Sequence, residues 1–210
     1  MFELGADVPS EIVPLSWLLG VWEGSGVISY LDGDDSREYQ FGQRVAFTHD
    51  GTPHLQYSCT AWLLPPSVET SPVELVETSS RPVFSEIGYW RLARQLGDAD
   101  PGPGMLPGRG APVFVDAESV ETLRNSRGAF DLEVTILQPG GVSELYLGEV
   151  NGPRIDLATD AVVRTATAKE YSAATRLYGL VDDHLLWAWD IAALGHDLRT
   201  HASGRLARVD

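Results

Sequence analysis

His201, close to the C-terminal end of the chain, is the residue whose side chain offers the clearest chemistry. An imidazole can bind a metal or a haem iron, transfer a proton, or simply pack within a fold. The other histidines that we considered as ligands, His54, His184 and His196, have no mutual spacing typical of a metal site. The role of His201 therefore depends on the element that positions it, which the surrounding residues 200–208 predict to be a β-strand.

A second pattern lies near the other end of the chain, where Gly20, Trp22, Gly24 and Gly26 recur at every second position. On a β-strand these residues point to the same side, because successive side chains alternate between the two faces. Glycine weakens a strand unless the backbone must bend or approach another segment closely. The first strand of a small closed barrel has to bend in this way, and we expect Trp22 to plug one end of the barrel.

Most of the chain after Gly20 has the residue pattern of short strands separated by turn residues, which is typical of an all-β barrel or sandwich. The candidate strands are 21–31, 38–48, 54–63, 84–94, 112–121, 129–137, 142–150, 153–158, 160–168, 171–181, 184–192 and 200–208. A short helical turn is predicted from Pro14 to Leu19, with Gly20 as its cap. We therefore expect an N-terminal arm over 1–13 and a single barrel domain over 14–210.

Two stretches interrupt the strand pattern, and both are expected to be long loops between strands. The first covers about 64–82 and repeats Val-Glu-Thr-Ser at 68–71 and 76–79. The second covers about 96–111 and is rich in glycine and proline.

Alternation in the last third of the chain predicts which side chains share a strand face. Leu185, Trp187, Trp189 and Ile191 fall on one face of their strand. In the last strand, His201, Ser203, Arg205 and Ala207 alternate with Ala202, Gly204, Leu206 and Arg208. The alternation thus predicts that Arg205 lies on the same face as His201.

The composition narrows the classes of function. The 210 residues carry a net charge of −15, which argues against a nucleic-acid or anionic-membrane partner. The single cysteine, Cys59, allows no internal disulfide and fits a reducing compartment. No apolar run approaches the roughly 20 residues that span a bilayer, and the N-terminus lacks the apolar core of a signal peptide. We expect a cytoplasmic protein.

Several motifs in the same order along the chain resemble the nitrobindin family. The first is Gly20-x-Trp22-x-Gly24-x-Gly26, which resembles the GxWxGxG signature of that family. Further matches are the segments 41–49, 85–91, 137–141, 164–170, 175–180 and 192–195. The resemblance covers about residues 15–210, apart from the two long loops.

The resemblance implies a ten-stranded antiparallel up-and-down β-barrel, similar to lipocalins and fatty-acid-binding proteins. It implies one ferric haem b per subunit at the open end of the barrel, isomerisation of peroxynitrite to nitrate, and binding of nitric oxide. His201 occupies the place of the axial ligand of the haem iron. Lys169 is in a position to pair with a haem propionate.

The residues also allow an alternative, a barrel that binds a fatty acid or another small hydrophobic ligand without haem. Arg205 and Arg176 are the candidates to hold a carboxylate in that case. The sequence leaves the oligomeric state open, with a homodimer as one option.

Overall fold

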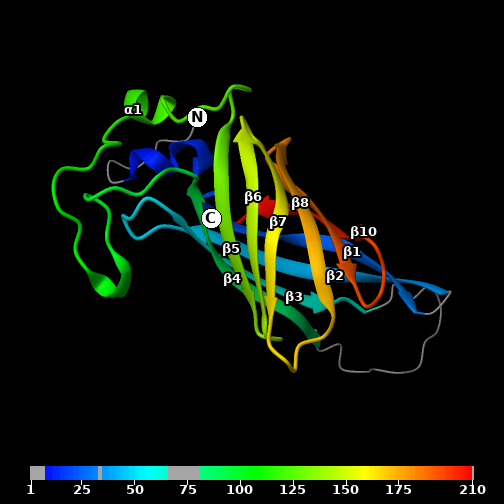
Figure 1. Ribbon diagram of the computed structural model, residues 1–210. Coiled ribbons are helices and arrows are strands. Elements are labelled where there is room, and N and C mark those ends of the chain that lie inside the picture. The colour runs from blue at the N-terminus through cyan, green and yellow to red at the C-terminus, as the bar shows by residue number, and fades with distance from the viewer. Residues whose placement is uncertain (1–7, 33–34, 66–80, 210) are drawn as a thin grey trace.

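Ten antiparallel strands form a closed barrel in the computed structural model, which describes residues 8–32, 35–65 and 81–209 (Figure 1). The strands are β1 (Gly20–Asp32), β2 (Asp35–Thr48), β3 (Leu55–Leu63), β4 (Arg81–Leu92), β5 (Phe130–Gln138), β6 (Val142–Asn151), β7 (Arg154–Arg164), β8 (Tyr171–Val181), β9 (His184–Ala193) and β10 (Arg199–Arg208). Each strand pairs with the next along the chain, and β1 pairs with β10. This connectivity confirms the predicted up-and-down barrel.

The barrel closes where glycines of β1 lie against the backbone of β10. A Cβ atom on Gly24 would lie 2.2 Å from the carbonyl oxygen of Arg205, and one on Gly26 would lie 2.1 Å from that of Ser203. Neither distance is compatible with a side chain, so the glycines at these two positions are required for the pairing of β1 with β10.

One end of the barrel is closed by the 3-10 helix η1 (Ser10–Leu18), which buries Ile12, Leu15 and Leu18. Trp22 lies beneath it with 1% of its surface exposed, and its indole nitrogen donates a hydrogen bond of 2.7 Å to the carbonyl oxygen of Leu18. The predicted role of Trp22 as a plug is therefore confirmed.

The helical turn was predicted from Pro14, but η1 begins at Ser10, so the last residues of the predicted arm 1–13 belong to this helix. Ile12, which lies within that arm, is 1% exposed. Because an apolar side chain needs a core to pack against, its burial ties this part of the chain to the barrel. Residues 1–7 of the arm lie outside the described part of the chain.

Two strand predictions were wrong. Residues 112–121 contain the helix α1 (Ala117–Glu121), because Asp116 accepts a hydrogen bond from the backbone nitrogen of Ser119 and caps it. The two predicted strands 153–158 and 160–168 are a single strand, β7, which continues through a register shift opposite Leu145 and Tyr146 of β6.

The glycine- and proline-rich loop predicted over 96–111 lies in the longer connection between β4 and β5, together with the 3-10 helix η2 (Pro103–Met105) and α1. Arg94 anchors this connection to η1, because its guanidinium bonds both Glu11 and Asp100. These hydrogen bonds and charges raise the pKa of Arg94, and they lower that of Asp100 to about 2.

At the other end of the barrel β1, β3, β5, β7 and β9 end and β2, β4, β6, β8 and β10 begin (Figure 1). Of the loop predicted over 64–82, residues 81 and 82 belong to β4. Residues 66–80 of that loop, with both Val-Glu-Thr-Ser repeats, lie outside the described residues. None of the helices in the described ranges is long and apolar enough to cross a membrane.

Replacing Gly26 by alanine tests the closure of the barrel. We expect Gly26→Ala to lower the free energy of unfolding by about 1–3 kcal/mol, because the new methyl group would overlap the backbone of β10. Gly179→Ala is the matched control, since a Cβ atom there has no neighbour closer than 3.8 Å. Equal urea midpoints for the two variants would contradict the role given to Gly26.

Candidate functional site

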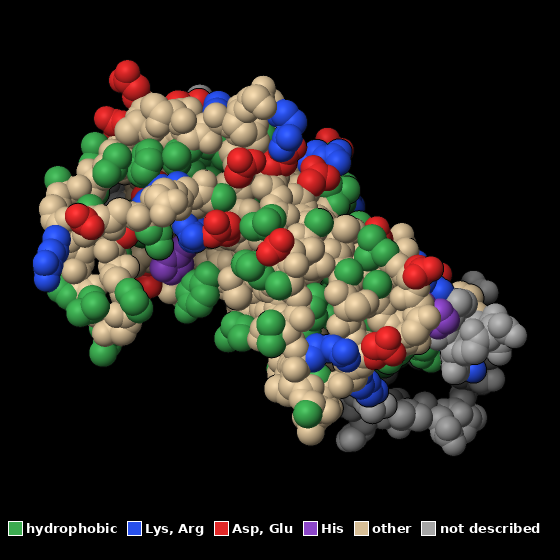
Figure 2. Space-filling model, viewed as in Figure 1, with side chains coloured by type: hydrophobic (Ala, Val, Ile, Leu, Met, Phe, Trp, Pro, Cys, Tyr) green, Lys and Arg blue, Asp and Glu red, His purple; other side chains and the backbone are tan. Residues whose placement is uncertain are grey.

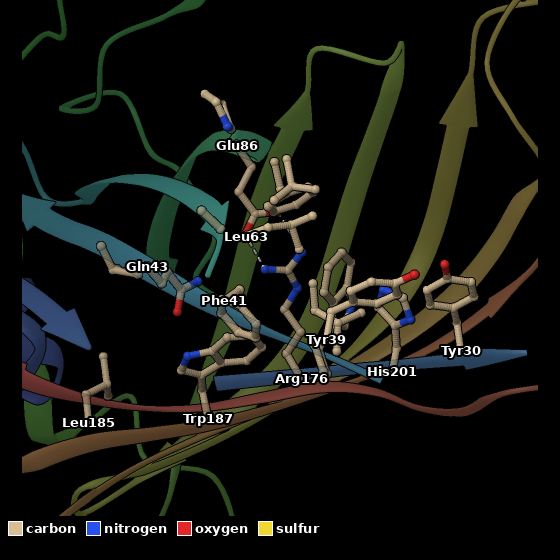
Figure 3. A pocket seen from close by; sticks show the side chains of 18 of the residues that line it. Tyr30, Tyr39, Phe41, Gln43, Leu63, Glu86, Arg176, Leu185, Trp187 and His201 are labelled. Atoms are coloured by element: carbon tan, nitrogen blue, oxygen red, sulfur yellow. Dashed lines mark hydrogen bonds and ion pairs between the residues drawn. The ribbon is translucent and has the colours of Figure 1, made fainter. Parts of the chain in front are cut away.

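The half of the barrel opposite η1 encloses a cavity of about 630 Å³ (Figure 3). Tyr30 and Tyr39, whose stacked rings have centroids 5.9 Å apart, line it at the open end. Apolar and aromatic side chains form much of its wall, namely Ile28, Phe41, Ala61, Leu63, Phe84, Trp187 and Trp189. The volume and the largely apolar lining are those of a small-molecule or cofactor site.

A β-bulge turns His201 into this cavity. In the pairing of β10 with β9, Thr200 lies opposite Asp190 and Ala202 lies opposite Trp189, so that His201 is an extra residue between them. As a result His201 and Ala202 both line the cavity, although they are adjacent in the chain. Bulges of this kind redirect single side chains, often next to functional sites.

The ring of His201 is half-buried and fixed by two neighbours. Trp189 lies edge-on to it, with ring centroids 5.6 Å apart, and the backbone of Ser29 forms a hydrogen bond with it. Burial lowers the pKa of His201 below the ordinary value of 6.5, the hydrogen bond to Ser29 opposes this shift, and the charge of Arg199 adds to it. The lowered pKa favours the neutral form of the His201 imidazole, which is the form that binds a metal.

The inner end of the cavity is formed by an ion pair that crosses the barrel. The guanidinium of Arg176 on β8 donates two hydrogen bonds, of 2.6 and 2.8 Å, to the two carboxylate oxygens of Glu86 on β4 (Figure 3). The side chains of both are at least 96% buried, with exposed fractions of 4% and 2%. Tyr57 donates a further hydrogen bond of 2.6 Å to Glu86.

A second buried carboxyl group, that of Glu144, extends the network behind Arg176. Tyr146 and Tyr171 both donate hydrogen bonds to Glu144, and Arg176 donates one of 2.9 Å to the hydroxyl of Tyr146. Burial opposes the charge of Arg176, but Glu86 and the surrounding hydroxyl groups hold its pKa well above the ordinary value. Arg176 is therefore a fixed cation whose hydrogen bonds are already engaged.

These positions correct the two arginines predicted as carboxylate ligands. Arg205 does not share a face with His201. It is exposed on the outside of the barrel and contacts His184, because the bulge shifts the alternation of β10 by one residue. Arg176 does line the cavity, but Glu86 occupies its guanidinium. The alternation predicted for β9 is confirmed, since Leu185, Trp187 and Trp189 all line the cavity.

Lys169 lies exposed in the connection between β7 and β8, at the same end of the barrel as His201 but outside the cavity lining. Arg199 stands two residues before His201 on β10, and its charge contributes to the lowered pKa of His201. Sequence reasoning missed Arg199, as it missed Trp189 as a contact of His201. The sequence carried no clear signal for either contact, because both depend on the register between β10 and β9, in which Arg199 pairs with Ile191.

The donor set fits a haem iron better than a bare metal ion. No group of three or more histidine, cysteine, aspartate or glutamate residues able to hold a metal occurs among the described residues. A haem iron needs only one or two protein ligands, and a single histidine is a common one. His201 is the one imidazole among the described residues that line the cavity, and the apolar walls around it suit a planar aromatic group.

A comparison with protein families matches residues 11–208 to the "THAP4-like, heme-binding beta-barrel domain" family. The chain is also similar to curated proteins named peroxynitrite isomerase. The one from Leifsonia xyli subsp. xyli is 61% identical over 210 residues, covering 100% of both chains. The one from Clavibacter michiganensis subsp. michiganensis is 58% identical over 210 residues, again covering 100% of both.

Among solved structures, the chain resembles the crystal structure of Rv2717c from M. tuberculosis with a TM-score of 0.64. The match covers 97% of this chain and 99% of that one, at 23% sequence identity. At this level of identity the likeness concerns the fold, and it agrees with the closed ten-stranded barrel described above.

The lowered pKa of His201 can be measured in haem-free protein. We expect the His201 signal in NMR spectra to titrate with a midpoint below 6.5, with His201→Gln used to assign it. The unfolded chain then binds more protons than the folded one as the pH falls below about 6.5, so this group makes the fold less stable in that range. A midpoint at or above 6.5 would contradict the buried environment given to His201.

Proposed function

Because this chain belongs to the THAP4-like, heme-binding beta-barrel domain family, we propose that it binds ferric haem b through His201 and isomerises peroxynitrite to nitrate. The bulge that directs His201 into the aromatic cavity is the observation that carries the proposal. One cavity of this kind supports one haem per subunit. The names of the relatives support the choice of peroxynitrite as the substrate.

In this proposal His201 is the residue that binds the iron. Its hydrogen bond to Ser29 and its contact with Trp189 restrict the rotation of the ring, as outer-shell contacts do for metal-bound histidines. Trp189 is itself in contact with Arg176, whose guanidinium carbon lies 4.4 Å from the centre of the indole ring. The orientation of the imidazole is thus tied to the buried ion pair.

Ferric haem, when bound, would supply an iron coordination position for the isomerisation of peroxynitrite to nitrate. The protein excludes water from that place with the aromatic walls of the cavity, among them Phe41, Phe84 and Trp187. No acid–base pair has to act, since nitrate has the atoms and the charge of peroxynitrite. Nitric oxide, a small ligand of low polarity, would bind at the same position.

The propionates of the haem are the groups that require cations at the mouth of the cavity. Lys169 and Arg199 both lie at this end of the barrel, and we assign them this role. Arg199 is partly buried and near His201, whereas Lys169 is exposed. Arg199 is accordingly the stronger partner of the two.

We also propose that the protein works in the cytoplasm, as a homodimer. Cys59 is buried and unpaired, which fits a reducing compartment. The outer faces of β4 to β7 carry exposed apolar side chains, among them Ile87 at 60% and Val163 at 66% exposure, and Figure 2 shows green side chains spread over one face of the barrel. A face of this kind supports pairing of two copies.

Replacing His201 by alanine tests the proposal. The reconstituted His201→Ala protein should lose the Soret band of bound haem and at least 90% of the peroxynitrite isomerisation, because no other imidazole lines the described cavity. His196→Ala is the control, since His196 is exposed in the turn before β10 and should leave both unchanged. A His201→Ala protein that keeps its Soret band and its activity would overturn the assignment.

If Arg199 and Lys169 pair with the haem propionates, replacing each of them should weaken haem binding to a different degree. Arg199→Gln should weaken haem binding about twofold to fivefold at low salt, and Lys169→Gln should weaken it less, because an exposed ion pair contributes little. Titration of haem-free protein with haem measures both values. Equal affinity of the wild type and Arg199→Gln at low salt would remove Arg199 from the site.

A further inference from the structure

Gln43, on the inner stretch of β2, carries a buried polar atom without a partner. The side chain is 6% exposed and lines the cavity (Figure 3). Its amide nitrogen donates a hydrogen bond of 3.0 Å to the sulfur of Cys59. Its carbonyl oxygen, Oε1, has no hydrogen-bond partner among the described residues. Buried carbonyl oxygens are nearly always satisfied, so this one indicates a ligand that brings a hydrogen-bond donor.

We propose that the haem-free barrel binds a neutral amphiphile, such as a long-chain alcohol or primary amide, whose head group donates a hydrogen bond to Gln43 Oε1 and whose tail extends toward the mouth. This activity is separate from haem binding and does not depend on His201. It gives the apolar cavity a second class of ligand.

Trp187 forms part of the cavity wall, but its indole nitrogen lies against the backbone of Gly204 on β10. The indole nitrogen of Trp187 is also buried and has no hydrogen-bond partner among the described residues. Trp187 packs against Phe41, with ring centroids 5.9 Å apart, and Phe41 stands two residues from Gln43 on β2. The hydrogen bond to Gln43 Oε1 is therefore the one that selects the head group, and a neutral hydroxyl or amide group can donate it.

The charges around Gln43 disfavour a fatty-acid carboxylate. Arg176 is the one cation deep in the described cavity lining, and both of its terminal nitrogens are bonded to Glu86. The carboxylate of Glu86 lines the same cavity and would repel a second anion there. An ionised carboxylate also has no proton to donate to Gln43 Oε1. The interior is therefore matched to a neutral head group.

The path from Gln43 to the mouth is suited to an alkyl chain. Phe41, Ala61, Leu63 and Phe84 line it, and Tyr30 and Tyr39 stand at its outer end. Burial of an alkyl chain against these side chains supplies the affinity, and the hydrogen bond to Gln43 supplies the preference for the head group.

The proposal is tested by comparing how tightly dodecanol and dodecanoate bind to haem-free protein at neutral pH. The two ligands have alkyl chains of the same length and differ only in the head group. Quenching of tryptophan fluorescence and isothermal titration calorimetry measure the dissociation constants. We expect dodecanol to bind at least tenfold more tightly than dodecanoate. Dodecanoate binding as tightly as dodecanol, or no binding of dodecanol, would overturn the proposal, while neither result touches haem binding through His201.

Gln43→Leu should weaken dodecanol binding about fivefold to tenfold, the range of one hydrogen bond. Gln40→Leu is the matched control, because Gln40 lies exposed on the same strand and should leave the affinity unchanged. Gln43→Met, which keeps the length of the side chain, replaces Gln43→Leu if that variant fails to fold. Unchanged dodecanol affinity in a folded Gln43 variant would show that the carbonyl is satisfied by water alone and would overturn the assignment.

Discussion

The ion pair between Arg176 and Glu86 divides the interior of this barrel into two parts. On one side Trp22, Phe47 and Trp90 form a close-packed core under η1, and on the other side lies the cavity. A small barrel lined only by apolar residues can fill its interior with side chains. A bidentate ion pair that crosses the barrel keeps its charged groups hydrogen-bonded in one place, since loss of either partner would leave an uncompensated buried charge. This ion pair therefore forms the fixed inner end of the cavity in the open half of the barrel.

The boundary also connects the fold to the chemistry of the site. The guanidinium of Arg176 lies against Trp189, and Trp189 lies edge-on to His201. The position of the His201 imidazole therefore depends on a series of contacts that begins at the ion pair between Arg176 and Glu86. Because Arg176 is satisfied by Glu86 and Tyr146, it is not available to a carboxylate ligand, and the same contacts that hold His201 make the inner cavity unsuitable for an anion.

Much of the fold could be predicted from local patterns. The alternation of Trp22, Gly24 and Gly26 placed these residues on one face of the first strand, and the structure shows why, since the β10 backbone leaves no room for a Cβ atom on either glycine. Turn residues marked most strand ends to within a few positions. Residues 112–121 were misassigned because their apolar residues suggested a strand, whereas the side chain of Asp116 decided in favour of a helix.

The sequence alone determined the barrel and the closed end at Trp22, and it singled out His201 as the candidate iron ligand, because alternation, turn residues and motif order are all local properties of the chain. Only the tertiary structure decided which way the last strand faces. Strict alternation predicted that Arg205 and His201 share a face of the strand. The extra residue in β10 can be seen only in its pairing with β9. Because of it, the side chain of His201 points into the barrel while Arg205 lies on the outside. The partnership of Arg176 with Glu86 was likewise invisible in the sequence, because 90 residues separate two side chains that meet across the barrel.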